Sequence, residues 1–190
     1  GIGWGSVPDE IDRFGVGATD TPARVERLAE TLEVVRALWS GEPVEFAGRH
    51  HRVAGGRQRP RPRGDIPIVV GGAGPRTLAL VARHATWWNC PIYAVDRLEE
   101  LRRRAGDARV SVQEVVGLVV DESRRDAVAS VTARRFGAMG PGVVVGTADE
   151  VVAHLRALRR RGVERVYTWF SDFADPATLA AFGDRVIAEL

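Results

Sequence analysis

Four short apolar segments, each followed by a helical pattern, constrain the fold of this chain more than any other feature. The segments span residues 66–70, 86–90, 110–120 and 163–170. A regular alternation of strand and helix predicts parallel strands joined by right-handed crossovers. Such strands form either an open doubly wound sheet or a (βα)8 barrel, and four units are too few to close a barrel, which needs eight strands.

Capping residues predict where the helices begin and end. Thr21, followed by a proline, predicts the start of an amphipathic helix that stops near Gly41. Thr147 and Glu150 form a capping-box pattern, and Gly162 suits the left-handed residue that closes the same helix. Three further pairs predict helix starts: Asp96 with Glu99, Ser123 with Asp126, and Asp175 with Pro176.

The remaining segments predict loops and one hairpin within a single domain of residues 1–190. Residues 1–20 are rich in glycine and predict the end of a strand followed by a long loop. Residues 44–53 alternate weakly around a glycine, which predicts a small hairpin, and residues 54–65 form a loop rich in Gly, Pro and Arg. Residues 137–146 predict a glycine-rich loop between two helices.

Composition excludes several classes of protein. The 190 residues include one cysteine, Cys90, so no intramolecular disulfide can form, and we expect a reducing compartment such as the cytoplasm. No apolar run reaches the roughly 18–20 residues that a membrane helix needs, and we expect neither a membrane partner nor a secretory leader. All 27 basic residues are arginines that lie mostly in helical patterns beside acids, so we expect solvated helix faces and no nucleic-acid partner.

The strongest local signal for a binding site is the run Gly71, Gly72, Ala73, Gly74 and Pro75. It follows a predicted strand and opens a helix, where glycines let a phosphate approach the backbone and the helix offers unpaired N–H groups. The run matches neither a P-loop nor a dinucleotide-binding fingerprint. Two interpretations therefore stay open: a phosphate site, and a tight turn that needs a glycine at positive φ.

A second glycine-rich segment, residues 1–5, offers a surface for a flat ligand. Gly3 lets a ligand lie against the backbone and Trp4 is able to cover it, whereas the alternative interpretation is a frayed terminus. No metal site is predicted, because the four histidines have no partners at metal-ligand spacing. Cys90 is expected to be a buried, unreactive thiol, since no histidine is placed to activate it.

Six motifs follow one another along the chain in a familiar order. They are GIGWG (1–5), RALWSGEPV (36–44), FAGRH (46–50), IPIVVGGAGP (66–75), ARHATWWN (82–89) and VGTADEV (145–151). Together they resemble the luciferase-like monooxygenase family, and most of all its branch that uses coenzyme F-420, a deazaflavin, in place of FMN. The resemblance covers nearly the whole chain, although no single motif is specific.

The resemblance implies a (βα)8 TIM barrel of which this chain holds roughly strands five to eight, with 44–53 as the family's hairpin insertion. It implies a cytoplasmic flavin- or deazaflavin-dependent oxidoreductase or monooxygenase that performs hydride transfer or oxygenation on a small organic substrate. The cofactor, coenzyme F-420 or FMN, would supply the redox chemistry. No catalytic residue is named, because the family's catalytic groups fall mostly in strands one to four.

The resemblance also assigns binding roles. Gly71, Gly72, Ala73 and Gly74 would hold the phosphate or ribityl tail, and Gly3 and Trp4 would lie near the tail or the ring. We therefore expect Gly72→Val to abolish cofactor binding with little loss of fold. The sequence departs from the family at Thr86 and Trp87, where Asp-Gly is usual, and at His51, where tyrosine is common.

Two alternatives to the enzyme stay open. Four βα units expose strand edges and one apolar face. The second interpretation is therefore a degenerate or binding-only module that pairs with a copy of itself, with a missing N-terminal half or with another subunit. The third interpretation is an open flavodoxin-like sheet whose Gly71–Gly74 turn binds a nucleotide. In the half-barrel, the side chains expected to face water are Val112, Val116, Leu118, Val166 and Thr168, or their alternates.

Overall fold

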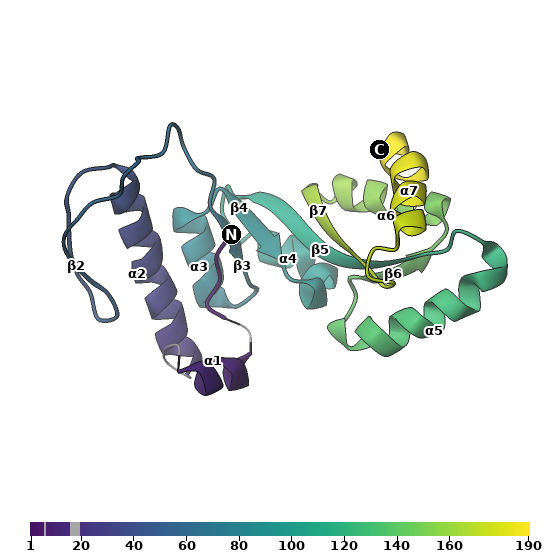
Figure 1. Ribbon diagram of the computed structural model, residues 1–190, viewed down its shortest axis with the longest axis horizontal. Coiled ribbons are helices and arrows are strands. Elements are labelled where there is room, and N and C mark those ends of the chain that lie inside the picture. Colours follow the sequence, from purple (N-terminus) through teal and green to yellow (C-terminus); the bar gives the residue numbers. More distant parts are fainter. Residues whose placement is uncertain (6, 16–19) are drawn as a thin grey trace.

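A parallel sheet runs through the molecule, flanked by helices (Figure 1). The computed structural model describes residues 1–5, 7–15 and 20–190. The strands of the sheet are β3 (Val69–Gly71), β4 (Trp87–Cys90), β5 (Arg109–Leu118), β6 (Val143–Gly146) and β7 (Val163–Phe170). The predicted α/β class and parallel strands are therefore confirmed.

The long strand β5 organises the sheet, because it pairs along both of its edges. Val112 pairs with Cys90 of β4 and with Val166 of β7, so β4 and β7 lie on opposite edges. Further along, β6 pairs with the same edge of β5 that β4 uses. The order β3–β4–β5–β7 follows the chain, as in a barrel segment, whereas β6 is an additional short strand.

Strand β6 lies inside residues 137–146, where the sequence predicted only a loop. Three consecutive valines, 143–145, supply the β-branched side chains of this strand. Two backbone hydrogen bonds hold the residue before it: Gly142 N–H donates to Ile92 O at 3.1 Å, and Val115 N–H donates to Gly142 O at 2.9 Å. The surrounding glycines masked a strand signal that was only four residues long.

Seven α-helices accompany the sheet among the described residues. They are α1 (Pro8–Phe14), α2 (Thr21–Trp39), α3 (Pro75–His84), α4 (Leu98–Arg102), α5 (Arg125–Phe136), α6 (Ala148–Arg160) and α7 (Pro176–Arg185). Helix α1 corrects the prediction of an uninterrupted loop over residues 1–20, of which residues 6 and 16–19 lie outside the described part. No described helix combines the length and apolarity that crossing a membrane requires.

The helix starts confirm some capping predictions and correct others. Thr147 and Glu150 form the predicted capping box, and Gly162 follows α6 at φ +88°. Asp175 accepts a hydrogen bond from Ala177 N at the start of α7. Three predictions were wrong. Asp20 rather than Thr21 caps α2, and neither Asp96 nor Glu99 caps α4. Asp121 caps a 3-10 turn at Glu122–Arg124, and α5, which follows that turn, has no side-chain cap.

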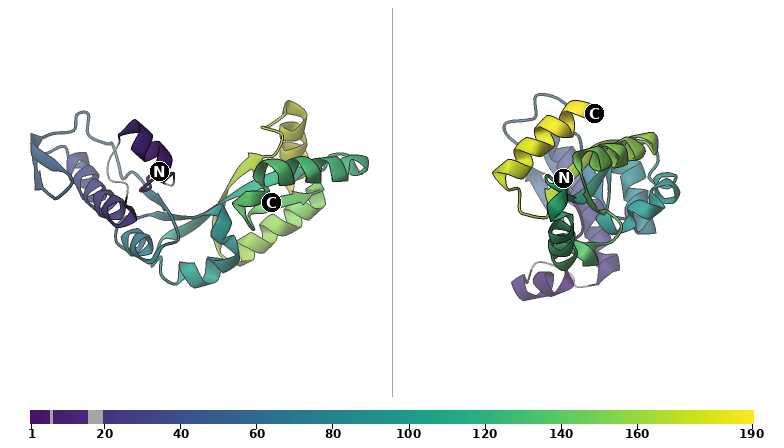
Figure 2. Two further views of the ribbon diagram at one scale, coloured as in Figure 1. Left: turned by 90° about the horizontal axis from the view of Figure 1, so that it is seen from below. Right: turned by 90° about the vertical axis from the view of Figure 1, so that its right-hand side faces the viewer.

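The hydrophobic core lies between one face of the sheet and the helices packed against it (Figure 2). Leu78 and Val81 of α3, Trp88 of β4, Val112 of β5 and Leu158 of α6 are each at most 1% exposed. A polar pair interrupts this core, because Glu114 of β5 is fully buried beside His154 of α6. The helices therefore cover the sheet by burying one set of alternating side chains.

The opposite face of the sheet is only partly covered. Helix α5 packs over its far end, on the other side of β5 and β6 from α6 (Figure 2), and a Cβ at Gly117 would lie 3.1 Å from Val128 Cγ1 of this helix. Tyr167 and Trp169 of β7 are 40% and 47% exposed. Val112, Val116 and Leu118 of β5, which were expected to face water, are at most 7% exposed, and Val166 and Thr168 of β7 are partly buried. The side chains open to solvent are the alternates of Val166 and Thr168 along β7.

The predicted hairpin is present as β1 (Val44–Ala47) and β2 (Arg52–Gly56), which pair antiparallel. Strand β2 runs to Gly56, so the hairpin extends three residues into the predicted loop 54–65. The Glu30 carboxylate of α2 accepts hydrogen bonds from the backbone N–H groups of Arg49, His50 and His51 at 2.7–2.9 Å. Desolvation would raise the pKa of Glu30, but these donors outweigh it and hold that pKa below its usual value. The ionised side chain of Glu30 thus fastens the hairpin to α2.

Candidate functional site

The predicted glycine turn lies where β3 ends and α3 begins. Gly72 has φ +136°, whereas Gly74 is the N-cap of α3 with an ordinary φ of −71°. Pro75 occupies the first helical position, so the first free N–H groups of the helix belong to the residues that follow it. The turn therefore presents backbone without side chains and the positive end of a helix dipole at the carboxyl edge of the sheet.

Strand β4 holds the turn in place. The indole N–H of Trp88, which is fully buried, donates to Gly72 O at 2.8 Å. The backbone N–H of Gly72 donates in turn to Asn89 O at 3.4 Å. These two bonds fix Gly72 from both sides, so the turn is rigid where it faces the sheet.

The structure brings the two predicted glycine segments together. Ile2 forms a parallel bridge to Val70, and Gly71 N–H donates to Ile2 O at 3.4 Å. The indole N–H of Trp4 donates to Thr77 Oγ1 of α3 at 3.2 Å. Residues 1–5 therefore form an extra strand end beside β3, and the interpretation of a frayed terminus was wrong.

The glycines of the turn serve different purposes. A Cβ on Gly72 would lie 2.8 Å from Thr77 Cγ2, and its positive φ strains any other residue, so the tight-turn interpretation applies at this position. A Cβ on Gly71 or on Gly74 would meet no atom closer than 3.9 Å. Neither of these two is required by the turn itself, and their open space suits a ligand that approaches the backbone.

The family departures have structural explanations. The ring of Trp87 lies between the guanidinium groups of Arg109 and Arg165, each 4.1 Å from its centroid. Thr86 Oγ1 accepts a hydrogen bond from Ile68 N at 3.3 Å, and His51 Nε2 lies 2.9 Å from Thr31 Oγ1. Trp87, Thr86 and His51 thus make local contacts that support strands and the hairpin.

Neither Cys90 nor His84 has the properties of a catalytic residue. Burial raises the pKa of the Cys90 thiol to about 12, so this thiol is not a nucleophile near neutral pH. Burial, together with Arg83 and Arg36, lowers the pKa of His84. Within the described residues no group of three His, Cys, Asp or Glu side chains is arranged to hold a metal ion.

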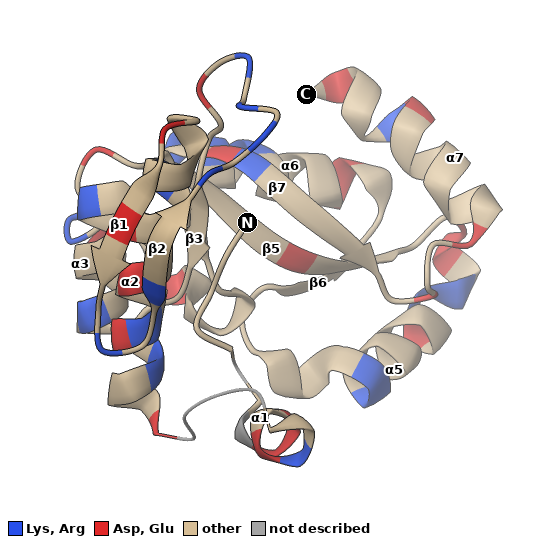
Figure 3. Ribbon diagram, turned by 60° about the vertical axis from the view of Figure 1, so that its left-hand side comes forward, with Lys and Arg blue, Asp and Glu red and all other residues tan. Residues whose placement is uncertain are grey.

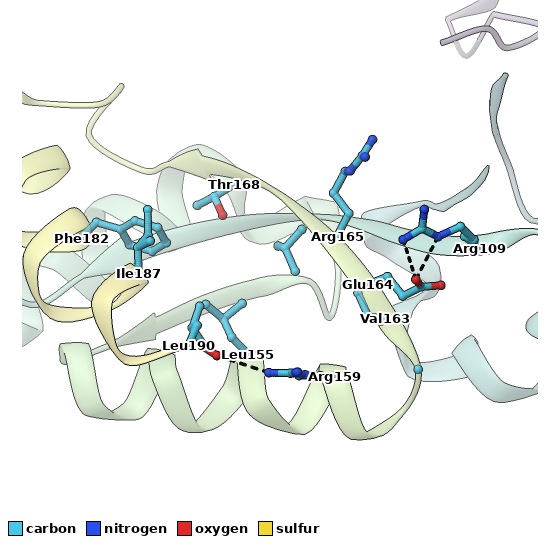
Figure 4. Close-up of a pocket in the computed structure, with 12 residues that line it drawn as sticks. Arg109, Leu155, Arg159, Val163, Glu164, Arg165, Thr168, Phe182, Ile187 and Leu190 are labelled. Atoms are coloured by element: carbon cyan, nitrogen blue, oxygen red, sulfur yellow. Dashed lines mark hydrogen bonds and ion pairs between the residues drawn. The ribbon is translucent and has the colours of Figure 1, made fainter. Parts of the chain in front are cut away.

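A cavity of about 590 Å³ lies between β7, α6 and the C-terminal residues (Figure 4). Its polar groups bond to one another: Arg109 Nη2 lies 2.8 Å from Glu164 Oε2, and Arg159 donates to Leu190 O at 3.3 Å. None of the predicted site residues lines it. Charged residues of both signs are intermixed along the helices and loops, while the sheet is largely uncharged (Figure 3).

Sequence reasoning missed Asn89 and Arg24 among the side chains near the glycine turn. Thr77 and Asn89 bond to Trp4 and to Ser111 respectively, and Arg24 of α2 lies over the Trp4 ring, 4.8 Å from its centroid. The sequence holds no signal for Arg24, because it is one arginine among many in an amphipathic helix. Only the pairing of residues 1–5 with β3 brings it near the turn.

Comparisons with known proteins agree with the family resemblance. A sequence model described as luciferase-like monooxygenase matches residues 1–141. An F420-dependent glucose-6-phosphate dehydrogenase of Nocardia farcinica is 37% identical over 86 residues, which are 45% of this chain and 24% of that protein. An uncharacterised protein of Mycobacterium tuberculosis is 28% identical over 134 residues, 66% of this chain and 46% of that protein. The matches thus span about a quarter to a half of these relatives.

Solved structures share the fold at low sequence identity. An F420-dependent secondary alcohol dehydrogenase in complex with an F420-acetone adduct superposes with a TM-score of 0.78 at 17% identity, covering 99% of this chain and 68% of that one. The EDTA monooxygenase of Chelativorans sp. BNC1 gives 0.75 at 15% identity, covering 97% and 64%. The fold is therefore that of the luciferase-like TIM-barrel enzymes, as predicted.

Proposed function

Because the chain belongs to the luciferase-like monooxygenase family, we propose that it forms part of a flavin- or deazaflavin-dependent oxidoreductase. The reaction would be hydride transfer or oxygenation of a small organic substrate. One observation carries this proposal: the glycine turn at the end of β3 lies beside Trp4, with open backbone at Gly71 and Gly74 and the start of α3 facing the same place.

The residues of the turn fit an anionic, flat cofactor. The phosphate or ribityl tail would lie against Gly71, Gly72, Ala73 and Gly74, where the helix dipole favours negative charge. Gly3 and Trp4 would border the tail or the ring, since a Cβ at Gly3 would meet no atom within 4 Å. The cofactor, coenzyme F-420 or FMN, would supply the redox chemistry, and these residues would bind and orient it.

The names of the related proteins support both cofactors. The relatives with the higher sequence identity are F420-dependent dehydrogenases, and one structural neighbour is a riboflavin lyase with modified FMN. We propose that the cofactor is coenzyme F-420 or FMN. Direct titration separates the two, because each has a characteristic absorbance and fluorescence.

The proposed cofactor site is tested by titrating the purified chain with FMN and with coenzyme F-420. We expect saturable binding of one of them, followed by absorbance or by quenching of cofactor fluorescence. Absence of binding by either, in a chain that is folded by circular dichroism, would contradict the proposal. That result would favour the binding-only module instead.

We further propose that β3, β4, β5 and β7 are strands five to eight of the barrel. The partly covered face of the sheet, called the open face below, would pack against another half-barrel. Arg165, Tyr167 and Trp169 alternate along β7 and are exposed on this face. Parallel strands are normally covered on both faces, so we expect another protein surface to cover the exposed rings of Tyr167 and Trp169. That partner would be strands one to four or a second copy of the chain.

Light scattering tests this pairing on the 190-residue chain. We expect species larger than the 20.7 kDa monomer, or a monomer that binds a hydrophobic dye. The double variant Tyr167→Ser with Trp169→Ser should reduce dye binding, whereas Phe14→Ser, an exposed residue of α1, should not. A monodisperse monomer that melts cooperatively and binds no dye would show that the open face needs no partner.

A further inference from the structure

Arg24, in the first turn of α2, is buried with no charged partner among residues 1–5, 7–15 and 20–190. Its side chain is only 6% exposed. Its Nη1 donates to Gly5 O at 3.3 Å and its Nη2 to Thr21 Oγ1 at 3.2 Å, both of them neutral oxygens. Its third contact is the Trp4 ring, 4.8 Å from the guanidinium carbon.

This environment leaves the guanidinium incompletely satisfied. The Nε of Arg24 is buried and has no hydrogen-bond partner among the described residues, and none of the ion pairs found in this part of the chain includes it. Arginines that are almost fully buried are normally paired with carboxylates or phosphates, because taking a charge out of water is costly. Two long hydrogen bonds to neutral oxygens and one ring contact offset only part of that cost.

A cavity adjoins the buried guanidinium. It has a volume of about 260 Å³ and lies between residues 2–5, Ile11 and α2. Trp4, Arg24, Arg27 and Thr31 are among the residues that line it. Trp4 links this cavity to the first turn of α3, because it also donates to Thr77.

We propose that Arg24 binds the anionic group, a phosphate or a carboxylate, of a ligand held in this cavity. The planar guanidinium presents several donors in a fixed fork, which matches the oxygens of either group better than an ammonium does. The anion supplies the charge partner that Arg24 lacks in the protein. This inference rests on the proposed function and deepens it, since Gly3 and Trp4, which we propose to border the cofactor, line the cavity.

Inorganic phosphate tests the proposal without any cofactor. The purified chain is titrated with phosphate at constant ionic strength set with sodium chloride, following the thermal midpoint and tryptophan fluorescence. We expect a saturable rise of the midpoint, because a ligand that binds the folded state stabilises it. Arg24→Met should weaken phosphate binding at least about tenfold, the loss expected for charge-assisted hydrogen bonds. Arg83→Met, an exposed arginine that pairs with Glu33, should leave it unchanged.

Arg24→Lys keeps the proposal testable if the methionine variant does not fold. Lysine retains the charge and the apolar stem but loses the fork, so we expect a rise of the midpoint that needs at least about threefold more phosphate. Phosphate that acts no differently from chloride on the wild type would overturn the proposal. Equal phosphate binding by wild type and by a folded Arg24 variant would overturn it too, and would leave Arg24 a purely structural residue.

Titrations with the cofactors and with phosphate identify which ligand carries the anion. If the anion belongs to the cofactor, Arg24→Met weakens the binding of FMN or coenzyme F-420. It leaves the binding of riboflavin, which has no phosphate, unchanged. If it belongs to the substrate, cofactor binding is unchanged while phosphate binding is lost. Because phosphate is tested alone, a failure of the cofactor proposal is distinguishable from a failure of this one.

Discussion

Replacement of His154 with alanine is expected to lower the free energy of unfolding by about 1–3 kcal/mol, the usual cost of leaving a buried polar group without its hydrogen-bond partner. Glu114 lies in the middle of β5 and its side chain is fully buried. Both of its carboxyl oxygens contact His154 Nε2 of α6, at 3.0 and 2.9 Å. Without the imidazole, the carboxyl group remains in the core between the sheet and α6 with no other hydrogen bond identified in the described structure.

Urea denaturation followed by circular dichroism measures this cost, and two variants serve as controls. Glu114→Gln keeps a side-chain oxygen that accepts from His154, so its cost should be clearly smaller. The double variant Glu114→Gln with His154→Ala should recover part of the loss, because no carboxyl group is then left buried. Arg97→Ala, which breaks the exposed pair with Glu100, should change stability little. Equal losses for His154→Ala and Arg97→Ala would contradict the role assigned to the buried pair.

The Glu114–His154 pair illustrates what the sequence does not reveal. The apolar pattern of residues 110–120 predicts a buried strand, and β5 is one. The pattern gives no partner for the carboxylate inside it, because His154 lies 40 residues further along the chain. Only the packing of α6 on β5 brings the two together.

Local signals predicted the elements that local chemistry determines. The capping box at Thr147, the closing Gly162 and the hairpin pairing of β1 with β2 depend on residues a few positions apart, and all three are confirmed. Strand β6 was missed because its pairing with β5 stabilises four residues that look like a loop by themselves. Helix α1 was missed because seven mostly polar residues carry little periodic signal.

The candidate site also combines a part that local sequence patterns predict with a part that depends on long-range contacts. The glycine run between a strand and a helix is a local pattern, and its position at the start of α3 follows from the sequence. The contact of Trp4 with Thr77 spans 73 positions, and the approach of Arg24 to Trp4 depends on it. These long-range contacts follow from the bridge between Ile2 and Val70, which no short pattern specifies.

The structure changes the best test of the glycine turn. Gly72→Val, which the sequence suggested as harmless to the fold, places a branched side chain at φ +136° and against Thr77 Cγ2. The turn would be strained and its bond with Trp88 disturbed, so a loss of binding would say nothing about a phosphate. The expectation of an intact fold was therefore wrong for this residue, and the substitution has to move to a glycine that the turn does not require.

Gly74→Val is that substitution, and it is expected to weaken binding of FMN or coenzyme F-420 at least about tenfold while the chain stays folded. Gly74 has φ −71° and ψ +149°, which valine adopts readily, and the nearest atom to a new Cβ is Thr77 Oγ1 at 3.9 Å. The isopropyl group would occupy the space in front of the first N–H groups of α3, so the phosphate would lose charge-assisted hydrogen bonds. Fluorescence titration measures the affinity, and the thermal midpoint reports the fold. Gly64→Val, also on open backbone but away from the turn, is the matched control and should bind normally. A folded Gly74→Val variant with wild-type affinity would show that the cofactor does not lie against this turn.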